Sequence, residues 1–293
     1  MLPDAPQITE SDLEKCRETG DFSPVLFKWY KFVAGLCVTF SNLLKKSPVV
    51  RDDISDRDYA ILIGFMNRAY RVMLANIALS HEGEFGESTS ILDRCIFESS
   101  VILSWLCRSD AADRFDRYIA SGLRTELEIA EQINASITKR GNGKVLQIEK
   151  RMLESVSRCL DEAGFDEERI RSTKRLPDLA AMLNFLGHQR FSYTAGQRIG
   201  SHHVHGTWVG LRHHYVEKDG HGKYRATHKS YTHENQYVYV TYSVLAALAD
   251  FVEFVFQNAD EEKQAILDLF KSTEEEITKV NKEVFGSDFD AVE

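Results

Sequence analysis

Apolar residues recur with a helical period along most of the chain, and this pattern predicts the fold class. Between Ser23 and Pro48 they recur every three to four residues, and the same spacing returns from Ser55 to Ala78. The run from Ser90 to Arg108 is apolar on almost every side, as in a helix buried in a core. These patterns predict an all-α protein.

Further segments complete the expected bundle. Helices are predicted from Ser11 to Gly20, from Leu176 onward, and over 111–139, 144–163, 235–258 and 259–285. The runs 210–216 and 223–228 flank Asp219-Gly220, a turn signal between two strands. We therefore expect an antiparallel bundle of about eight helices with one small β-hairpin.

The same pattern divides the chain into three parts. Residues 1–50 are expected to form N-terminal helices that pack on the bundle, and residues 51–258 the main helical domain that carries a polar site. Residues 259–293 are expected to form a C-terminal amphipathic helix.

The composition indicates in which cellular compartment the protein is expected. A content of 43% hydrophobic residues is typical of a globular protein with a core, and five cysteines without C-x-x-C spacing are expected to be reduced. The first residues lack the basic and apolar regions of a signal peptide. The best apolar run, 244–256, is interrupted by Asp250 and Glu253, whereas a membrane span needs roughly 20 apolar residues. We expect a cytoplasmic protein without a membrane partner.

Basic residues and histidines are concentrated in one part of an acidic chain. The formal net charge is -9, which argues against a protein that coats nucleic acid along its whole surface. Nine of the ten histidines lie between His188 and His233, and this segment has seven Lys or Arg against Glu217 and Asp219. A local basic site on an acidic body favours RNA or another phosphate-bearing ligand.

Charged and polar residues at helical spacing form the candidate site. Arg94 and Glu98 lie one turn apart inside the apolar run 90–108, where a buried charge needs partners. In a helix, one polar stripe would contain Tyr193, Gln197, Ser201 and His205. Arg94 and Glu98 either form an internal salt bridge between helices or join this stripe in a polar site.

These residues resemble a known family. Ser201 and the segment Val204-His205-Gly206-Thr207-Trp208, together with the Arg94 to Glu98 helix, resemble an uncharacterised bacterial all-helical family, domain of unknown function 5677. The resemblance covers roughly residues 91–256. It implies a helical fold and a shared polar site around Arg94, Glu98, Ser201 and His205, and it supplies no activity.

A second resemblance is to the HEPN superfamily, whose RNA-cutting members have an Arg followed after four to six residues by a His. Arg198 precedes both His203 and His205 at such spacings, although Ile199 stands where nucleases usually have a polar residue. The resemblance implies metal-independent RNA cleavage without a cofactor, with His203 or His205 transferring protons and Arg198 binding the phosphate. It also implies a homodimer and a role in bacterial defence or stress.

Several alternatives remain open at this level. Trp208 and Tyr215 either stack on a base or fill the core, and Ser201 with His205 is a weak candidate nucleophile pair without a G-x-S-x-G elbow. The histidines lack the standard short metal-ligand signatures, so no metal site is expected.

The rival to a nuclease is a non-catalytic ligand-binding or scaffolding protein with a structural Arg/Glu/Ser/His cluster. Either way, the expected ligand-binding residues are Tyr193, His202, Trp208, Arg212 and His214.

Overall fold

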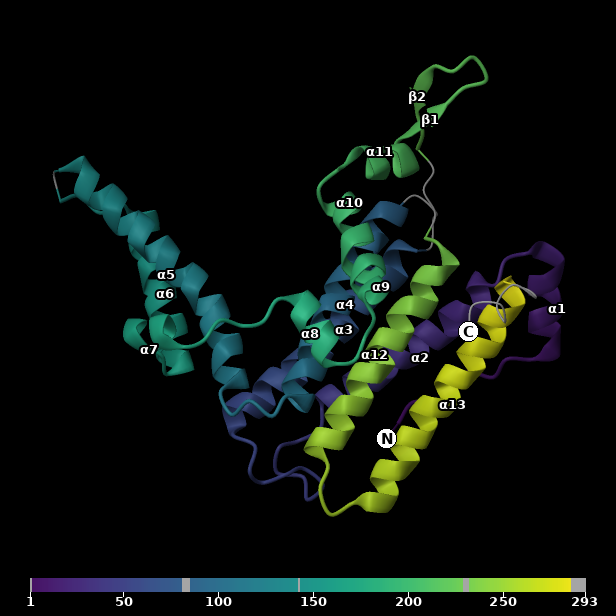
Figure 1. The fold of residues 1–293 in the computed structure, drawn as a ribbon, viewed down its shortest axis with the longest axis horizontal. Coiled ribbons are helices and arrows are strands. Elements are labelled where there is room, and N and C mark those ends of the chain that lie inside the picture. Colours follow the sequence, from purple (N-terminus) through teal and green to yellow (C-terminus); the bar gives the residue numbers. More distant parts are fainter. Residues whose placement is uncertain (1, 81–84, 142, 229–231, 286–293) are drawn as a thin grey trace. The chain divides into compact units, whose positions relative to one another are not determined.

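The computed structural model describes residues 2–80, 85–141, 143–228 and 232–285. Over these residues the fold consists of helices and one two-stranded antiparallel hairpin (Figure 1). The predicted all-α class with a small β-hairpin is confirmed. There are more helices than the eight expected, because the chain between 164 and 214 forms a series of short helices.

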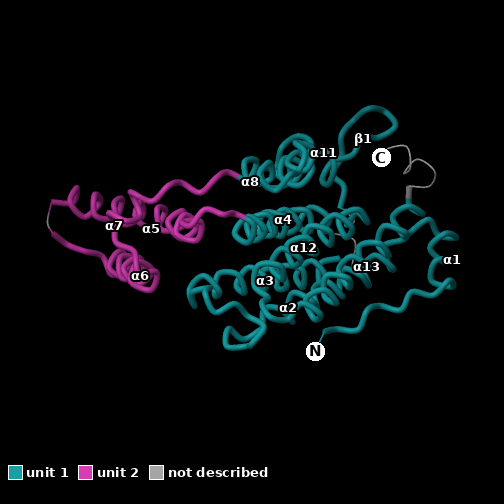
Figure 2. Tube along the Cα trace, turned by 60° about the horizontal axis from the view of Figure 1, so that its bottom comes forward, with its two compact units in different colours: residues 1–108, 179–293 teal, residues 109–178 magenta. Residues whose placement is uncertain are grey.

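The chain forms two compact units (Figure 2). One contains residues 1–108 and 179–293, and the other contains residues 109–178. The long helices of the first unit are α1 (Glu10–Thr19), α2 (Ser23–Ser41), α3 (Asp56–Leu79), α4 (Gly86–Arg108), α12 (Glu234–Val255) and α13 (Asp260–Phe285).

Helix α12 lies at the centre of the first unit. It packs against α4, α2 and α13, and α3 packs against α2 and α4 (Figure 1). Phe251 of α12 is fully buried, and its ring meets that of Phe40 edge to face with centroids 6.2 Å apart. Phe40 lies in α2, so α2 packs directly on α12.

The apolar character of α12 was underestimated from the sequence. By length and composition, Glu234–Val255 is apolar enough to cross a membrane, because the apolar stretch begins well before Val244. In this structure 56% of its most apolar stretch is buried inside the protein. Burial against α2, α4 and α13 accounts for the same composition, as in the core helix of a bundle.

The second unit contains a helical hairpin formed by the helices predicted over 111–139 and 144–163. Helices α5 (Arg114–Arg140) and α6 (Gln147–Ala163) pack together, and the short helix α7 (Glu167–Ser172) packs on α5. Helix α5 ends at Gly141, whose φ of 68° is a left-handed conformation that glycine adopts without strain. Arg140 and Glu149 close the hairpin with hydrogen bonds of 2.8 and 2.5 Å.

A series of short elements carries the histidine-rich segment of the first unit. They are α8 (Leu179–Phe185), α9 (Arg190–Tyr193), the π-helix η1 (Thr194–Ile199), α10 (Gly200–Val204), α11 (Trp208–His214), β1 (Val216–Lys218) and β2 (Tyr224–Ala226). Both η1 and α10 pack on α4, and α11 packs on α10. This packing brings the segment against a helix about a hundred residues earlier in the chain.

The β-hairpin is present, but its first strand was placed too early. Val216 pairs with Ala226 across the hairpin, and Asp219 accepts two backbone hydrogen bonds that close the turn. Residues 210–214, which were expected in the strand, belong to α11 instead. Gly210 allows α11 to pack closely on α10, because a Cβ there would lie 2.7 Å from the carbonyl oxygen of His202.

Candidate functional site

Arg94, Glu98 and Ser201 come together where α10 packs on α4. The guanidinium of Arg94 donates to the Glu98 carboxylate through Nε at 2.8 Å and to Ser201 Oγ through an η nitrogen at 3.0 Å. Ser201 Oγ in turn donates to the carbonyl oxygen of Gln197 at 2.9 Å. We call Arg94, Glu98 and Ser201 the Arg94 clamp. Two of its members were expected to need polar partners, and they find them in each other and in Ser201.

Two glycines allow this close packing. A Cβ on Gly196 would lie 2.1 Å from Tyr239 Oη and 2.4 Å from a ring carbon of Phe97, and neither distance is possible for real atoms. A Cβ on Gly200 would lie 3.0 Å from Cβ of Arg94. A glycine such as Gly200 lowers the intrinsic stability of a helix. In the structure, Gly196 and Gly200 bring η1 and α10 into contact with α4 and α12.

The other residues of the predicted stripe do not share one face. The π-helical turn of η1 has more residues per turn than an α-helix, so a spacing of four no longer repeats one direction. Tyr193 is half-buried before this turn, whereas His205 is exposed at the C-terminal end of α10. Arg198 is exposed as well. Within the described residues, neither Arg198 nor His205 has a side-chain hydrogen bond or ion pair.

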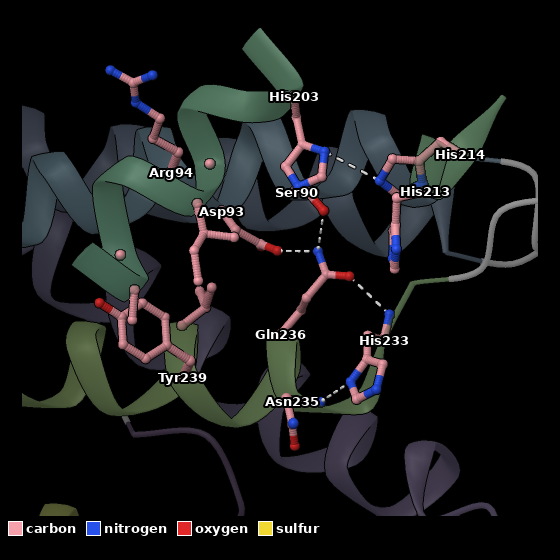
Figure 3. Close-up of a pocket in the computed structure, with 15 residues that line it drawn as sticks. Ser90, Asp93, Arg94, His203, His213, His214, His233, Asn235, Gln236 and Tyr239 are labelled. Atoms are coloured by element: carbon pink, nitrogen blue, oxygen red, sulfur yellow. Dashed lines mark hydrogen bonds between the residues drawn. The ribbon is translucent and has the colours of Figure 1, made fainter. Parts of the chain in front are cut away.

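His203 and His214 line a pocket of about 320 Å³ between α4, η1, α10, α11 and α12 (Figure 3). Their rings are hydrogen-bonded, with His203 Nδ1 and His214 Nε2 3.1 Å apart. Burial lowers the pKa of His203, and it lowers the pKa of His214 to about 4. Both imidazoles are therefore neutral near pH 7, and one nitrogen of the contact donates while the other accepts.

A buried carboxyl group in the same pocket was missed from the sequence. Asp93 accepts hydrogen bonds of 2.5 Å from the side-chain amides of Asn76 and Gln236, and the Gln236 amide also donates to Ser90 at 3.1 Å. Burial raises the pKa of Asp93 to about 7. The available signal was an acidic residue directly before Arg94 inside the apolar run 90–108. Nothing local indicated its partners, which lie on α3 and α12.

The remaining candidate residues lie at or near the exposed surface of α10, α11 and the hairpin. Trp208 is 59% exposed and meets Tyr224, which is 54% exposed, edge to face at 5.5 Å between centroids. Arg212 is exposed and donates to the carbonyl oxygen of Val216 at 2.9 Å. His202 is half-buried, with Nδ1 2.9 Å from Thr207 Oγ1. Trp208 therefore does not fill the core.

Two alternative chemistries lack the required arrangement. The Ser201 hydroxyl is engaged with Arg94 and with the carbonyl oxygen of Gln197, so it is not paired with His205 as a nucleophile would be. Among the described residues, no three His, Cys, Asp or Glu side chains converge in a way that could hold a metal ion. The five cysteines are free, as expected.

Asp93 and His214 contribute with opposite signs to the pH dependence of stability. The folded-state pKa of Asp93 is raised from 3.8 to about 7, so its contribution to the free energy of unfolding is lost as pH rises through this window. The folded-state pKa of His214 is lowered from 6.5 to about 4, so its contribution is lost as pH falls. The two effects offset each other in the wild type.

The substitution Asp93→Asn should remove one of these two opposing contributions to the free energy of unfolding. Because the variant keeps only the His214 effect, its free energy of unfolding should increase relative to wild type as pH rises from about 4 to about 7. The increase is expected to be on the order of 1.4 kcal/mol for each unit of the lost pKa shift. Urea denaturation of both proteins at pH 4.5, 6 and 8 measures it. A difference that stays constant with pH would contradict the buried position of Asp93.

The fold and the site together define a class: an all-α protein in which a short helical segment, held on a core helix by the Arg94 clamp, closes a histidine-lined pocket. The model of a family of unknown function, DUF5677, matches residues 59–224, and the chain belongs to this family. The expected membership is therefore confirmed. The matched range includes the Arg94 clamp and the His203–His214 pair, but not α12. Searches of curated proteins and of solved structures found no match.

Proposed function

We propose that this protein binds single-stranded RNA on the exposed surface of η1, α10, α11 and the β1–β2 hairpin, and cleaves it without a metal ion through Arg198 and His205. We call this surface the RNA face, defined by Arg198, His205, Trp208, Arg212, Lys218 and Tyr224. The observation that carries the proposal is that exposed aromatic rings and exposed cations lie on the same short stretch of chain.

The positive charge of the histidine-rich segment between His188 and His233 supports a polyanionic ligand. All of its described Lys and Arg residues are exposed, namely Arg190, Arg198, Arg212, Lys218, Lys223 and Arg225. Within the described part of the chain, Arg225 alone among them forms an ion pair, with Glu217 at 2.8 Å. The other cations therefore remain available for phosphate groups, whose neutralisation releases counterions and makes binding dependent on salt.

The aromatic side chains favour a single strand over a duplex. Trp208 and Tyr224 expose more than half of their surface, although large aromatic rings are usually buried. The ammonium group of Lys218 lies 5.8 Å from the centre of the Tyr224 ring. Unpaired bases stack on such rings while neighbouring cations follow the backbone, and this combination is typical of single-strand binding.

His205 is the better placed of the two candidate histidines for catalysis. His203 is hydrogen-bonded to His214 inside the pocket, whereas His205 is exposed and follows Arg198 by seven residues. In the proposed reaction the 2′-hydroxyl attacks the adjacent phosphorus while His205 accepts its proton. The bond between phosphorus and the 5′-oxygen breaks, His205 returns the proton to the leaving 5′-oxygen, and a 2′,3′-cyclic phosphate remains. Arg198 stabilises the charge that develops on the phosphoryl oxygens. Within this proposal the Arg94 clamp positions α10 and does not contact the substrate.

A non-catalytic role is the second candidate, and one observation favours it. Arg94, Glu98 and Ser201 satisfy each other's hydrogen bonds, as expected for a cluster that stabilises the fold. If the RNA face binds no RNA, the protein is a ligand-binding or scaffolding protein. The homodimer and the defence setting implied by the HEPN resemblance remain predictions, and light scattering of the full chain tests the first.

Trp208→Ala should weaken RNA binding by about 10-fold or more, because stacking of one base contributes about 1–3 kcal/mol. Fluorescence anisotropy with a labelled single-stranded RNA, in EDTA and at several salt concentrations, measures the affinity. Leu74→Ala is the matched control, since Leu74 is an exposed apolar residue on α3. Equal affinities of wild type and Trp208→Ala, or no binding by the wild type at low salt, would rule out the RNA face.

A further inference from the structure

We propose that the pocket lined by Asp93, His203, His214, Gln236 and Tyr239 is a binding site for a small organic cation, whose ammonium group pairs with the Asp93 carboxylate. We call it the Asp93 pocket. It lies between α4, α10, α11 and α12, and it includes none of the residues of the RNA face. The two proposals can therefore succeed or fail independently.

Asp93 has the chemistry of a carboxylate that lacks its cation. It is only 9% exposed, and its hydrogen-bond donors are the neutral amides of Asn76 and Gln236. Over the residues that the structure describes, no Lys, Arg or His lies within salt-bridge distance of it. A buried carboxylate without a charged partner is costly, and proteins usually pair such groups. A cationic ligand would supply the missing charge.

The neighbouring Arg94 does not fill this role. Arg94 lines the pocket, but its guanidinium is held by Glu98 and Ser201. Figure 3 shows the Arg94 head group directed away from His203 and Gln236. The Asp93 carboxyl, in contrast, is directed at the Gln236 amide along the pocket wall.

The histidines of the pocket argue against an anionic ligand. His203 and His214 are hydrogen-bonded to each other, and burial lowers the pKa of both, so neither provides a positive charge near pH 7. An anion would lie beside the Asp93 carboxylate and these two imidazoles, and the guanidinium of Arg94, the one Arg of the pocket lining, is already held by Glu98 and Ser201. A cation would meet the carboxylate and the electron-rich faces of aromatic rings, which attract cations.

The volume of the pocket and its apolar lining residues indicate the size and shape of the ligand. A volume of about 320 Å³ is at the lower end of the range for small-molecule sites. The pocket is also lined by Ala195, Gly196, Val240 and Tyr239, which are apolar or aromatic. This combination suits a primary amine attached to a small apolar body.

Titration of the full chain with benzylamine, benzyl alcohol and benzoate at pH 8 separates charge from shape. We expect benzylamine to bind, and benzyl alcohol to bind about 10- to 100-fold more weakly, because it lacks the charged hydrogen bond. Isothermal titration calorimetry measures the affinities, with n-butylamine as a second amine. Benzoate binding as tightly as benzylamine, or no binding of either amine at millimolar concentration, would overturn the proposal.

The variant Asp93→Asn tests whether the amine binds at the Asp93 carboxylate. This variant should lose benzylamine binding by about 10-fold or more, since the charge is removed while the size is kept. Asp250→Asn is the matched control, because Asp250 is a half-buried carboxylate on α12 that neither lines the pocket nor belongs to the Arg94 clamp. Circular dichroism and urea denaturation check that both variants fold. Retained binding in Asp93→Asn would refute the assignment.

The wild type alone provides a second measurement if Asp93→Asn does not fold. Because burial raises the pKa of Asp93 to about 7, the carboxylate must ionise before it can pair with an amine. Affinity for benzylamine should therefore fall about 10-fold for each pH unit below this value. The titratable and charged groups that line the pocket with Asp93 are Arg94, His203, His213, His214, His233 and Tyr239. Tyr30 and Tyr237 also interact with the charge of Asp93, and the amides of Asn76 and Gln236 donate hydrogen bonds to it. An affinity that does not change between pH 5 and 8 would contradict the pairing.

Discussion

Gly196→Ala is expected to lower the free energy of unfolding by about 1–3 kcal/mol or more, because it forces an atom into a fully packed contact. The added methyl group would lie 2.1 Å from Tyr239 Oη and 2.4 Å from the ring of Phe97. Phe97 is buried and Tyr239 is half-buried, so η1 must move away from α4 and α12 to make room. This movement should also weaken the contact between Arg94 and Ser201.

Urea denaturation of Gly196→Ala and wild type measures the loss, and Gly64→Ala is its control. Gly64 lies exposed in the middle of α3, and a Cβ there would meet nothing within 4 Å. Its replacement should therefore raise the free energy of unfolding by about 0.5–1 kcal/mol, since alanine favours a helix over glycine. If Gly196→Ala proved as stable as wild type, η1 could not lie as close to α12 as the structure places it.

His205→Ala and Arg198→Ala should each reduce RNA cleavage by about 100-fold or more, the usual contribution of a general acid or base and of a charge that stabilises the transition state. Affinity for RNA should change far less, because the aromatic rings and the other cations of the RNA face remain. Gel analysis of a defined RNA, incubated with each protein in EDTA, measures the rates.

Two further histidine variants show where the chemistry occurs. His221→Ala is the matched control, because His221 is exposed in the turn of the hairpin and should not affect the rate. His203→Ala tests the alternative histidine inside the Asp93 pocket. Loss of cleavage in His203→Ala but not in His205→Ala would move the reaction into the pocket, and equal rates in all four variants would remove the nuclease proposal.

Much of the fold was predictable because helix formation depends on neighbours three and four residues apart. The apolar period located α2, α3, α4, α12 and α13. One long-range contact was also predictable in part. Arg94 and Glu98 stand in an apolar helix, and the cost of an unpaired buried charge required them to find partners.

The sequence by itself determined the all-α class, most helix positions, the hairpin and the need of Arg94 for a partner, because these follow from local spacing and from the cost of burying charge. Only the tertiary structure decided that Asp93 meets Asn76 and Gln236, that Gly196 must have no side chain, and that Trp208 is exposed. These facts depend on how helices distant in the chain approach each other. The distances between helices are set by side chains on every packed face at once, and no local pattern encodes them.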